Sequence, residues 1–182
     1  MLRYLPQRLV LFLCLCGIVS SADSSGVWLD VPFIQQQKDG CGAAVIAMVM
    51  DYWKAAKPEL RLGPVKAAEI QRELFSRPEH GIYASDLQKY FEGHGFLVFT
   101  FRGDWDLLRS HLEKGRPLIV ALRPNQGEIS SHYVVIAGLD WQNDLVMVND
   151  PAQKKLLKVD RKQFEHEWTK VHRWTLLAVP RR

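Results

Sequence analysis

Short apolar segments rich in β-branched residues dominate the second half of the chain, and they constrain its fold most strongly. Three of them have the length and composition of strands: Leu118–Leu122, Tyr133–Leu139 and Leu145–Val148. Only residues 140–144 separate the last two, which predicts a hairpin. Two more short strands are predicted nearby, at Leu156–Val159 and Trp174–Val179. Strands this closely spaced predict an antiparallel sheet.

Helical patterns dominate the first half of the chain. The Ala- and Met-rich run after Cys41 continues to Trp53 and predicts a buried helix. Further helices are predicted at Val65–Phe75, Ala84–Glu92, from Asp104 to Gly115, and Arg161–Trp168, with a strand at Phe96–Phe101 and an edge strand or loop at Val27–Ile34. The order predicts one α+β domain, in which N-terminal helices pack on a C-terminal antiparallel sheet.

The N-terminus has the pattern of a secretory signal peptide over residues 1–22. Arg3 and Arg8 provide its positive charge, and Leu9–Val19 is an apolar run. Ser20 and Ala22 provide the small residues that signal peptidase requires. The run is shorter than the roughly 20 residues of a stable membrane anchor. We therefore expect a secreted or periplasmic protein whose single domain spans residues 23–182, with no membrane span after cleavage.

The net charge of +4 does not indicate a nucleic-acid partner. Two of the 24 Lys and Arg residues lie in the signal segment, whereas all 20 Asp and Glu residues lie beyond it. The remaining basic residues are interspersed with acidic ones, and a phosphate-binding face requires a denser basic stripe.

Cys41 is the one cysteine left after removal of residues 1–22, so it cannot form an internal disulfide. It stands at the predicted start of a helix, where unpaired backbone N–H groups favour the thiolate. Gly40 and Gly42 flank it and allow backbone and substrate to approach closely. These features favour a nucleophile, although a small buried apolar residue fits the same position.

A nucleophilic thiol needs a base, and six histidines are candidates. His132 differs from the other five because it begins a strongly apolar strand, where a side chain is held rigidly at the edge of the core. His94 lies in a glycine turn, His80 in a polar loop, and His111 and His166 in charged helices, where we expect exposed side chains.

The predicted hairpin brings Asp150 back to the level of His132, 18 positions earlier. A carboxylate there would fix the imidazole tautomer and stabilise imidazolium, although Asp150-Pro151 also fits an ordinary turn. Gln35, Gln36 and Gln37 precede the thiol, and an amide N–H in that position can donate to an oxyanion.

From about Val31 to Val179, the chain resembles the papain-like cysteine peptidases that process double-glycine leader peptides, the bacteriocin-processing family. The resemblance rests on three elements: Gln35 six positions before the CGAA that begins at Cys41, HYVV from His132, and NDPA from Asn149. In that family the peptidase is the N-terminal domain of bacteriocin-exporting ABC transporters, and stand-alone relatives occur.

The resemblance implies a papain-like fold and a role for each matching residue. It makes Cys41 the nucleophile, His132 the general base and acid, Asp150 the orienting carboxylate and Gln35 the oxyanion donor. Gln36 and Gln37 do not match the six-residue spacing and receive no role. We expect the stand-alone, exported form of the family.

The partners expected from these observations are peptide or protein substrates, which need not carry a double-glycine leader because leader processing is cytoplasmic. The chain has no GxxxxGK[ST] loop, so we expect no ATP binding. No His, Cys and Asp cluster has the spacing of metal ligands, so we expect no metal or organic cofactor. Two alternatives remain open: a catalytically silent peptide-binding module of the same fold, and a papain-like acyl or amide transferase.

Overall fold

The computed structural model describes residues 25–123, 131–153 and 156–181. The predicted signal peptide at residues 1–22 lies outside these ranges, as does Ser130. Within them, no helix is both long and apolar enough to cross a membrane.

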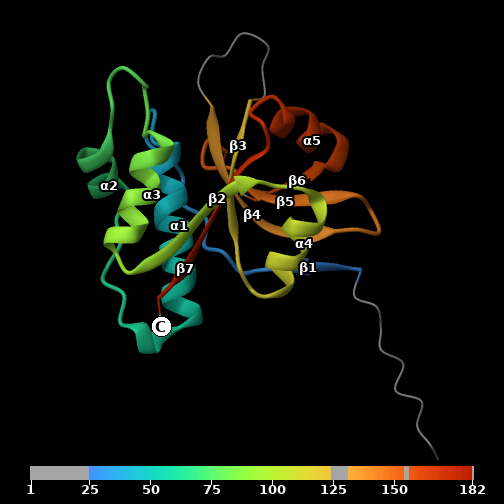
Figure 1. Cartoon of the computed structure of the whole chain (residues 1–182), viewed down its shortest axis with the longest axis horizontal. Coiled ribbons are helices and arrows are strands. Elements are labelled where there is room, and N and C mark those ends of the chain that lie inside the picture. Colours follow the sequence, from blue (N-terminus) through green and yellow to red (C-terminus); the bar gives the residue numbers. More distant parts are fainter. Residues whose placement is uncertain (1–24, 124–130, 154–155, 182) are drawn as a thin grey trace, which may run out of the picture.

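Helices from the first half of the chain form one side of the molecule (Figure 1). They are α1 (Cys41–Ala56), α2 (Ala67–Leu74) and α3 (Ala84–Gly93), with a short 3-10 turn at Pro58–Leu60. The predictions for all three helices are confirmed to within two residues at their N-termini. Helix α1 is the central one, and its residues from Gly42 to Met50 are all buried, which agrees with its uniformly apolar sequence.

The sheet is antiparallel throughout and lies beside these helices. Its strands run in the order β2-β7-β3-β4-β5-β6, and β1 pairs with the second half of β4. Their bounds are β1 Gly26–Trp28, β2 Phe96–Arg102, β3 Leu118–Leu122, β4 His132–Asp140, β5 Leu145–Asn149, β6 Leu157–Asp160 and β7 Trp174–Pro180. Every strand predicted in the second half of the chain is present, and the hairpin between β4 and β5 is confirmed.

Two further helices, α4 (Trp105–Glu113) and α5 (Arg161–Thr169), lie on the opposite side in Figure 1. Asp104 caps α4 by accepting a hydrogen bond from the Leu107 N–H at 2.8 Å, and Asp160 caps α5 in the same way. The core lies between α1 and the sheet, where the Trp53 indole N–H donates to the carbonyl of Ala178 at 3.0 Å. Helices and sheet therefore form one α+β unit.

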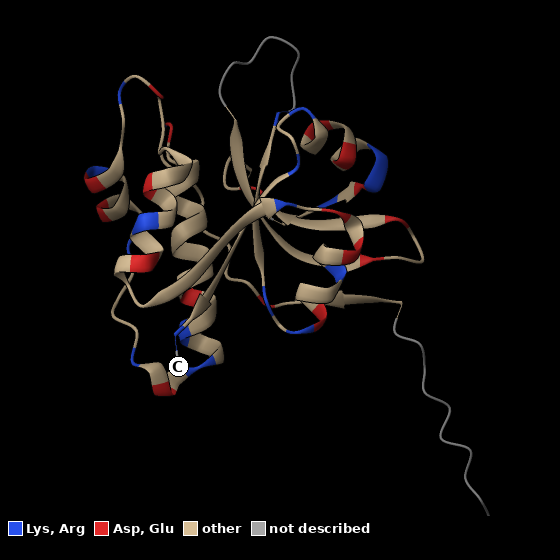
Figure 2. Ribbon diagram, viewed as in Figure 1, with Lys and Arg blue, Asp and Glu red and all other residues tan. Residues whose placement is uncertain are grey.

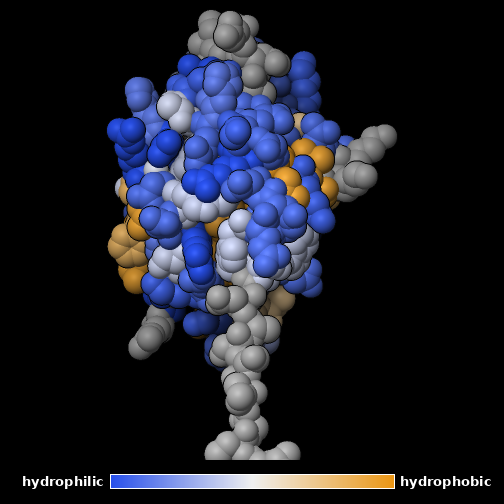
Figure 3. Space-filling view, turned by 90° about the vertical axis from the view of Figure 1, so that its right-hand side faces the viewer, coloured by the Kyte–Doolittle hydropathy of each residue, from blue (hydrophilic) through white to orange (hydrophobic). Residues whose placement is uncertain are grey.

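Basic and acidic residues are interspersed along the helices and loops (Figure 2). The face that includes α4 and α5 is mainly hydrophilic, with small separate apolar groups (Figure 3). Two tryptophans of this region are covered by guanidinium groups: Arg161 lies 4.1 Å from the Trp105 ring centroid, and Arg109 lies 4.3 Å from that of Trp141. Both rings are therefore packed against charged side chains of the same domain.

Candidate active site

Cys41 is the first residue of α1 and lies where the chain turns into the helix. The preceding turn is closed by a hydrogen bond from the Gly40 N–H to the Gln37 carbonyl at 3.0 Å, and Asp39 has a left-handed φ of 56°. No side chain caps the helix, so its first N–H groups are not bonded by a capping residue. The thiol lies at the positive end of a helix, as predicted, and is partly exposed.

Gly42 allows a close contact beside Cys41. A Cβ atom at this position would lie 2.9 Å from the Cβ of Ile82, closer than side chains normally approach. Ile82 is buried and lines the cleft in front of Cys41. Any larger residue at position 42 would displace Ile82 from this position.

His132 and Asp150 are brought together by the β4–β5 hairpin, as predicted. His132 is the first residue of β4 and pairs with Leu122 of β3, and Asp150 follows directly after β5. The His132 Nε2 and the Asp150 Oδ1 lie 2.6 Å apart, and the Ala152 N–H donates to the same carboxylate oxygen at 2.9 Å. The second bond fixes the carboxylate independently of the histidine.

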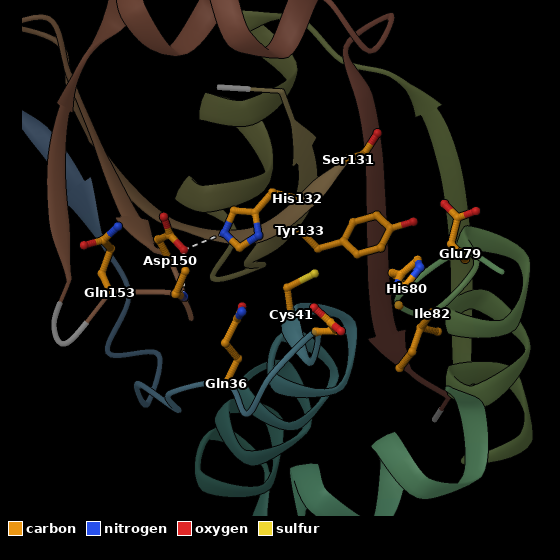
Figure 4. Close-up of a pocket in the computed structure, with 13 residues that line it drawn as sticks. Gln36, Cys41, Glu79, His80, Ile82, Ser131, His132, Tyr133, Asp150 and Gln153 are labelled. Atoms are coloured by element: carbon orange, nitrogen blue, oxygen red, sulfur yellow. Dashed lines mark hydrogen bonds and ion pairs between the residues drawn. The ribbon is translucent and has the colours of Figure 1, made fainter. Parts of the chain in front are cut away.

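These contacts decide the protonation of the imidazole. Burial disfavours its charged form, but the hydrogen bonds with Asp150 and Cys41 and the negative charges of both groups raise the pKa of His132 to about 10. The pKa of Asp150 is lowered, because the hydrogen bond and positive charge of His132 outweigh its burial. Since Nε2 faces Asp150, Nδ1 is the nitrogen left for the thiol, and the ring lies between the two groups (Figure 4).

The structure places Gln36, not Gln35, in the cleft. Gln35 and Gln37 are exposed, whereas Gln36 is half-buried, lines the cleft and is directed toward Cys41 and His132 (Figure 4). The Gln36 N–H donates to the Pro151 carbonyl at 2.9 Å, which ties this segment to the turn after Asp150. The side chain of Gln35 does not line the described cleft, so its role as oxyanion donor stays a prediction.

Glu79 and His80 also line the cleft, and sequence reasoning gave neither a role. They belong to a tight loop that is closed by an antiparallel bridge between Ser76 and Gly81. His80 has a left-handed φ of 52°, which few residues other than glycine adopt. A polar loop with a histidine gave only a weak signal for this placement.

The other histidines lie away from Cys41. His94 and His166 are exposed, as expected, and His94 stacks on Tyr90. The expectation for His111 is wrong: it is half-buried against Phe101, and burial together with Arg116 and Lys114 lowers its pKa. Phe101 of β2, the element that precedes α4, packs against the His111 ring, so this face of the helix is not fully solvated.

The cleft in front of Cys41 has a volume of about 360 Å³ and opens between the helices and the sheet. Among the described residues, no group of three or more His, Cys, Asp and Glu side chains is placed to bind a metal ion. A thiol at a helix start, an imidazole bonded to it and a carboxylate that orients the imidazole form the arrangement of nucleophilic cysteine hydrolases.

Residues 28–175 match the Peptidase_C39 like family, and the chain belongs to this family of cysteine-type peptidases. No curated protein matches the chain. The resemblance predicted from the three sequence elements is thereby confirmed at the level of the family.

Solved structures share the fold at low sequence identity. A Bacillus anthracis chain described as a C39-like peptidase is 19% identical with a TM-score of 0.68, over 86% of this chain and 98% of its own. A double glycine motif protease from an AMS/PCAT transporter, solved with the leader peptide, is 24% identical with a TM-score of 0.64, over 85% and 95%. The peptidase domain of Streptococcus ComA, a bifunctional ABC transporter of a quorum sensing pathway, is 21% identical with a TM-score of 0.63, over 83% and 99%. The papain-like α+β fold is confirmed.

Proposed function

We propose that this protein hydrolyses peptide bonds through a Cys41-His132-Asp150 triad with Gln36 as the oxyanion donor. The observation that carries the proposal is the 2.6 Å contact between His132 and Asp150, beside the one cysteine that lines the described cleft. The leader peptide bound by one solved neighbour supports a peptide as the kind of substrate.

In the first half of the reaction, the thiolate of Cys41 attacks the scissile carbonyl carbon and His132 holds the thiol proton on Nδ1. The C=O electron pair moves to oxygen, which accepts hydrogen bonds from the Gln36 amide and the backbone N–H at Cys41. The C–N bond then breaks, and the leaving amine takes the proton from His132. A thioester on Cys41 remains.

In the second half, water attacks the thioester and gives a proton to His132. The C–S bond breaks and the carboxylic acid leaves, which restores the Cys41 thiolate beside the His132 imidazolium. Asp150 keeps the imidazole in the required orientation and stabilises its charge through both steps.

The test is incubation of the mature protein with a peptide library, read by mass spectrometry, with Cys41→Ala as the control. We expect cleavage products from the wild type and none from the variant. Products that persist with Cys41→Ala would eliminate the thiol mechanism. Added acceptor amines separate hydrolysis from acyl transfer, since a transferase would yield amide products. An activated Cys41 should be alkylated quickly well below pH 8, so slow alkylation together with no cleavage would favour a silent binding module.

We also propose that the protein is exported after removal of residues 1–22. The apolar run, its flanking arginines and the small residues at Ser20 and Ala22 support this proposal. N-terminal sequencing of protein recovered outside the cytoplasm should give Asp23 as the first residue. A sequence that begins at Met1 would show a retained segment.

A further inference from the structure

The geometry of the proposed reaction fixes the direction in which a substrate crosses the cleft. The carbonyl oxygen points to Gln36 and the leaving amine to His132, so the acyl part must extend away from both. It then runs across Cys41 toward Ile82, Tyr133, Glu79 and His80, which lie on the far side of the thiol (Figure 4). This inference rests on the proposed function.

The acyl side combines an apolar wall with a carboxylate. Ile82 and Tyr133 are both buried and line the cleft, whereas Glu79 is exposed next to them. Burial, the charge of Cys41 and the charge of Glu79 all raise the pKa of Tyr133, which places the carboxylate within electrostatic reach of the phenol. A substrate side chain that packs along Ile82 and Tyr133 would therefore end at the Glu79 carboxylate.

The loop that carries Glu79 places its acidic and basic side chains on different sides. Hydrogen bonds from the Ser76 N–H to the Gly81 carbonyl (2.8 Å) and from the Gly81 N–H to the Ser76 carbonyl (3.3 Å) close it. This closure brings Glu79 into the cleft, while Arg77 lines a separate hollow beside α2. The acidic residue is thus held at the cleft by backbone bonds, and the basic residue of the loop is kept out of it.

The described lining of the cleft contains three carboxylates and no Lys or Arg. Asp150 is paired with His132, whereas Asp39 and Glu79 form no ion pair within the described ranges. Basic side chains, including Lys170, line an adjoining hollow that shares Tyr133 and Ser131 with the cleft. The sign of the charge therefore changes across Tyr133, and the acidic part is the one next to the thiol.

We propose that Glu79 selects substrates with a Lys or Arg side chain on the acyl side of the scissile bond. The aliphatic stem of such a side chain packs against Ile82 and Tyr133, and its charged end reaches the Glu79 carboxylate. An acidic side chain at the same position meets Glu79 and Asp39 with like charge. The subsite therefore discriminates by sign as well as by size.

The first arm of the test measures kcat/KM for peptides that differ at a single acyl-side position. Lys, norleucine and Glu are placed in turn at each of the four positions before the scissile bond. At one of these positions we expect Lys to exceed norleucine by about two- to fivefold, the range of an exposed ion pair, and Glu to be poorest. Glu79→Gln should abolish the Lys advantage and Glu79→Lys should reverse it. Glu73→Gln, an exposed carboxylate on α2 away from the cleft, is the matched control and should leave the ratios unchanged.

The second arm measures binding of the same peptides to Cys41→Ala by fluorescence anisotropy, so it does not depend on turnover. A Lys preference that disappears in Cys41→Ala/Glu79→Gln supports the subsite even if the catalytic proposal fails. Equal binding and equal cleavage of the Lys and norleucine peptides at all four positions would overturn the proposed subsite. If that cleavage still depended on Cys41, the proposed peptidase function would stand. A Lys preference that persists in Glu79→Gln would also overturn the role of Glu79.

Discussion

Gln36 and Pro151 are joined by a backbone hydrogen bond of 2.9 Å, which links the segment before Cys41 to the turn after Asp150. A second bond reinforces the link, because the buried Asn149 amide donates to the Val31 carbonyl at 2.9 Å. The glutamine amide and the Asp150 carboxylate are therefore positioned by the same pair of neighbouring segments. Because these two bonds hold the segments together, we expect Gln36 and Asp150 to keep their relative positions when a substrate enters the cleft.

The first prediction concerns the two glutamines. Gln36→Ala should lower kcat by about a hundred- to a thousandfold, because one oxyanion donor acts chiefly in the transition state. Alkylation of Cys41 by iodoacetamide should change little, since that reaction forms no oxyanion. Gln35→Ala, one residue away and exposed, is the control and should retain activity. A larger loss in Gln35→Ala than in Gln36→Ala would return the role to Gln35.

A second prediction follows from the imidazolium. Because the pKa of His132 is raised to about 10, kcat/KM should stay high through neutral pH and fall as the pH approaches 10. Asp150→Asn keeps the shape of the side chain but removes its charge, so this alkaline limb should move to lower pH by about one unit or more. The measurement is kcat/KM from pH 5 to 11 for both proteins. An unshifted limb would mean that Asp150 does not act through His132.

The same pair predicts a pH window of stability. The lowered pKa of Asp150 stabilises the fold above its ordinary value of 3.8, and this contribution is lost as the pH falls. The raised pKa of His132 stabilises the fold fully below 6.5, and this contribution is lost as the pH rises toward 10. The difference in Tm between wild type and Asp150→Asn should therefore be largest from about pH 4 to 6.5. Thermal unfolding from pH 3 to 11 tests this, and a difference that grows toward pH 10 would contradict it.

A fourth prediction concerns Gly42. Gly42→Ala should lower the free energy of unfolding by about 1–3 kcal/mol, because its methyl group would meet Ile82 in a packed interior. Gly93→Ala is the matched control: nothing lies within 4 Å of its Cβ position in α3, so the substitution should be neutral or slightly stabilising. Urea unfolding of both variants gives the comparison. Equal stability of Gly42→Ala and wild type would mean that Ile82 moves aside freely, and activity would then show whether the cleft tolerates the shift.

The sequence was sufficient to predict the pairing of His132 with Asp150, because local patterns determine the position of each residue at the end of its strand. Apolar strands of defined length joined by a short connection leave little freedom in where the second strand ends, and a helix that starts at Cys41 is set by its own composition. The positions of these residues could therefore be predicted without knowledge of contacts between distant segments.

The remaining parts of the site depend on contacts that no local pattern encodes. Gln35 was favoured by a spacing in sequence, whereas the direction of the side chain is set by the bond between Gln36 and Pro151, over a hundred residues away. Glu79 and His80 reach the cleft through a loop closed by backbone bonds and by a left-handed residue that is not glycine. His111 is covered by Phe101 of a different element.

Helix α1 carries Cys41, the proposed nucleophile, at its first residue and fills the centre of the core with the residues that follow. Most segments that bear catalytic groups in proteins open more readily than the interior, and their activity fades before the fold does. Here the thiol cannot leave its place without withdrawal of the most buried helix from the sheet. Loss of activity on heating should therefore coincide with cooperative unfolding, which makes residual turnover a direct measure of the fraction of intact molecules.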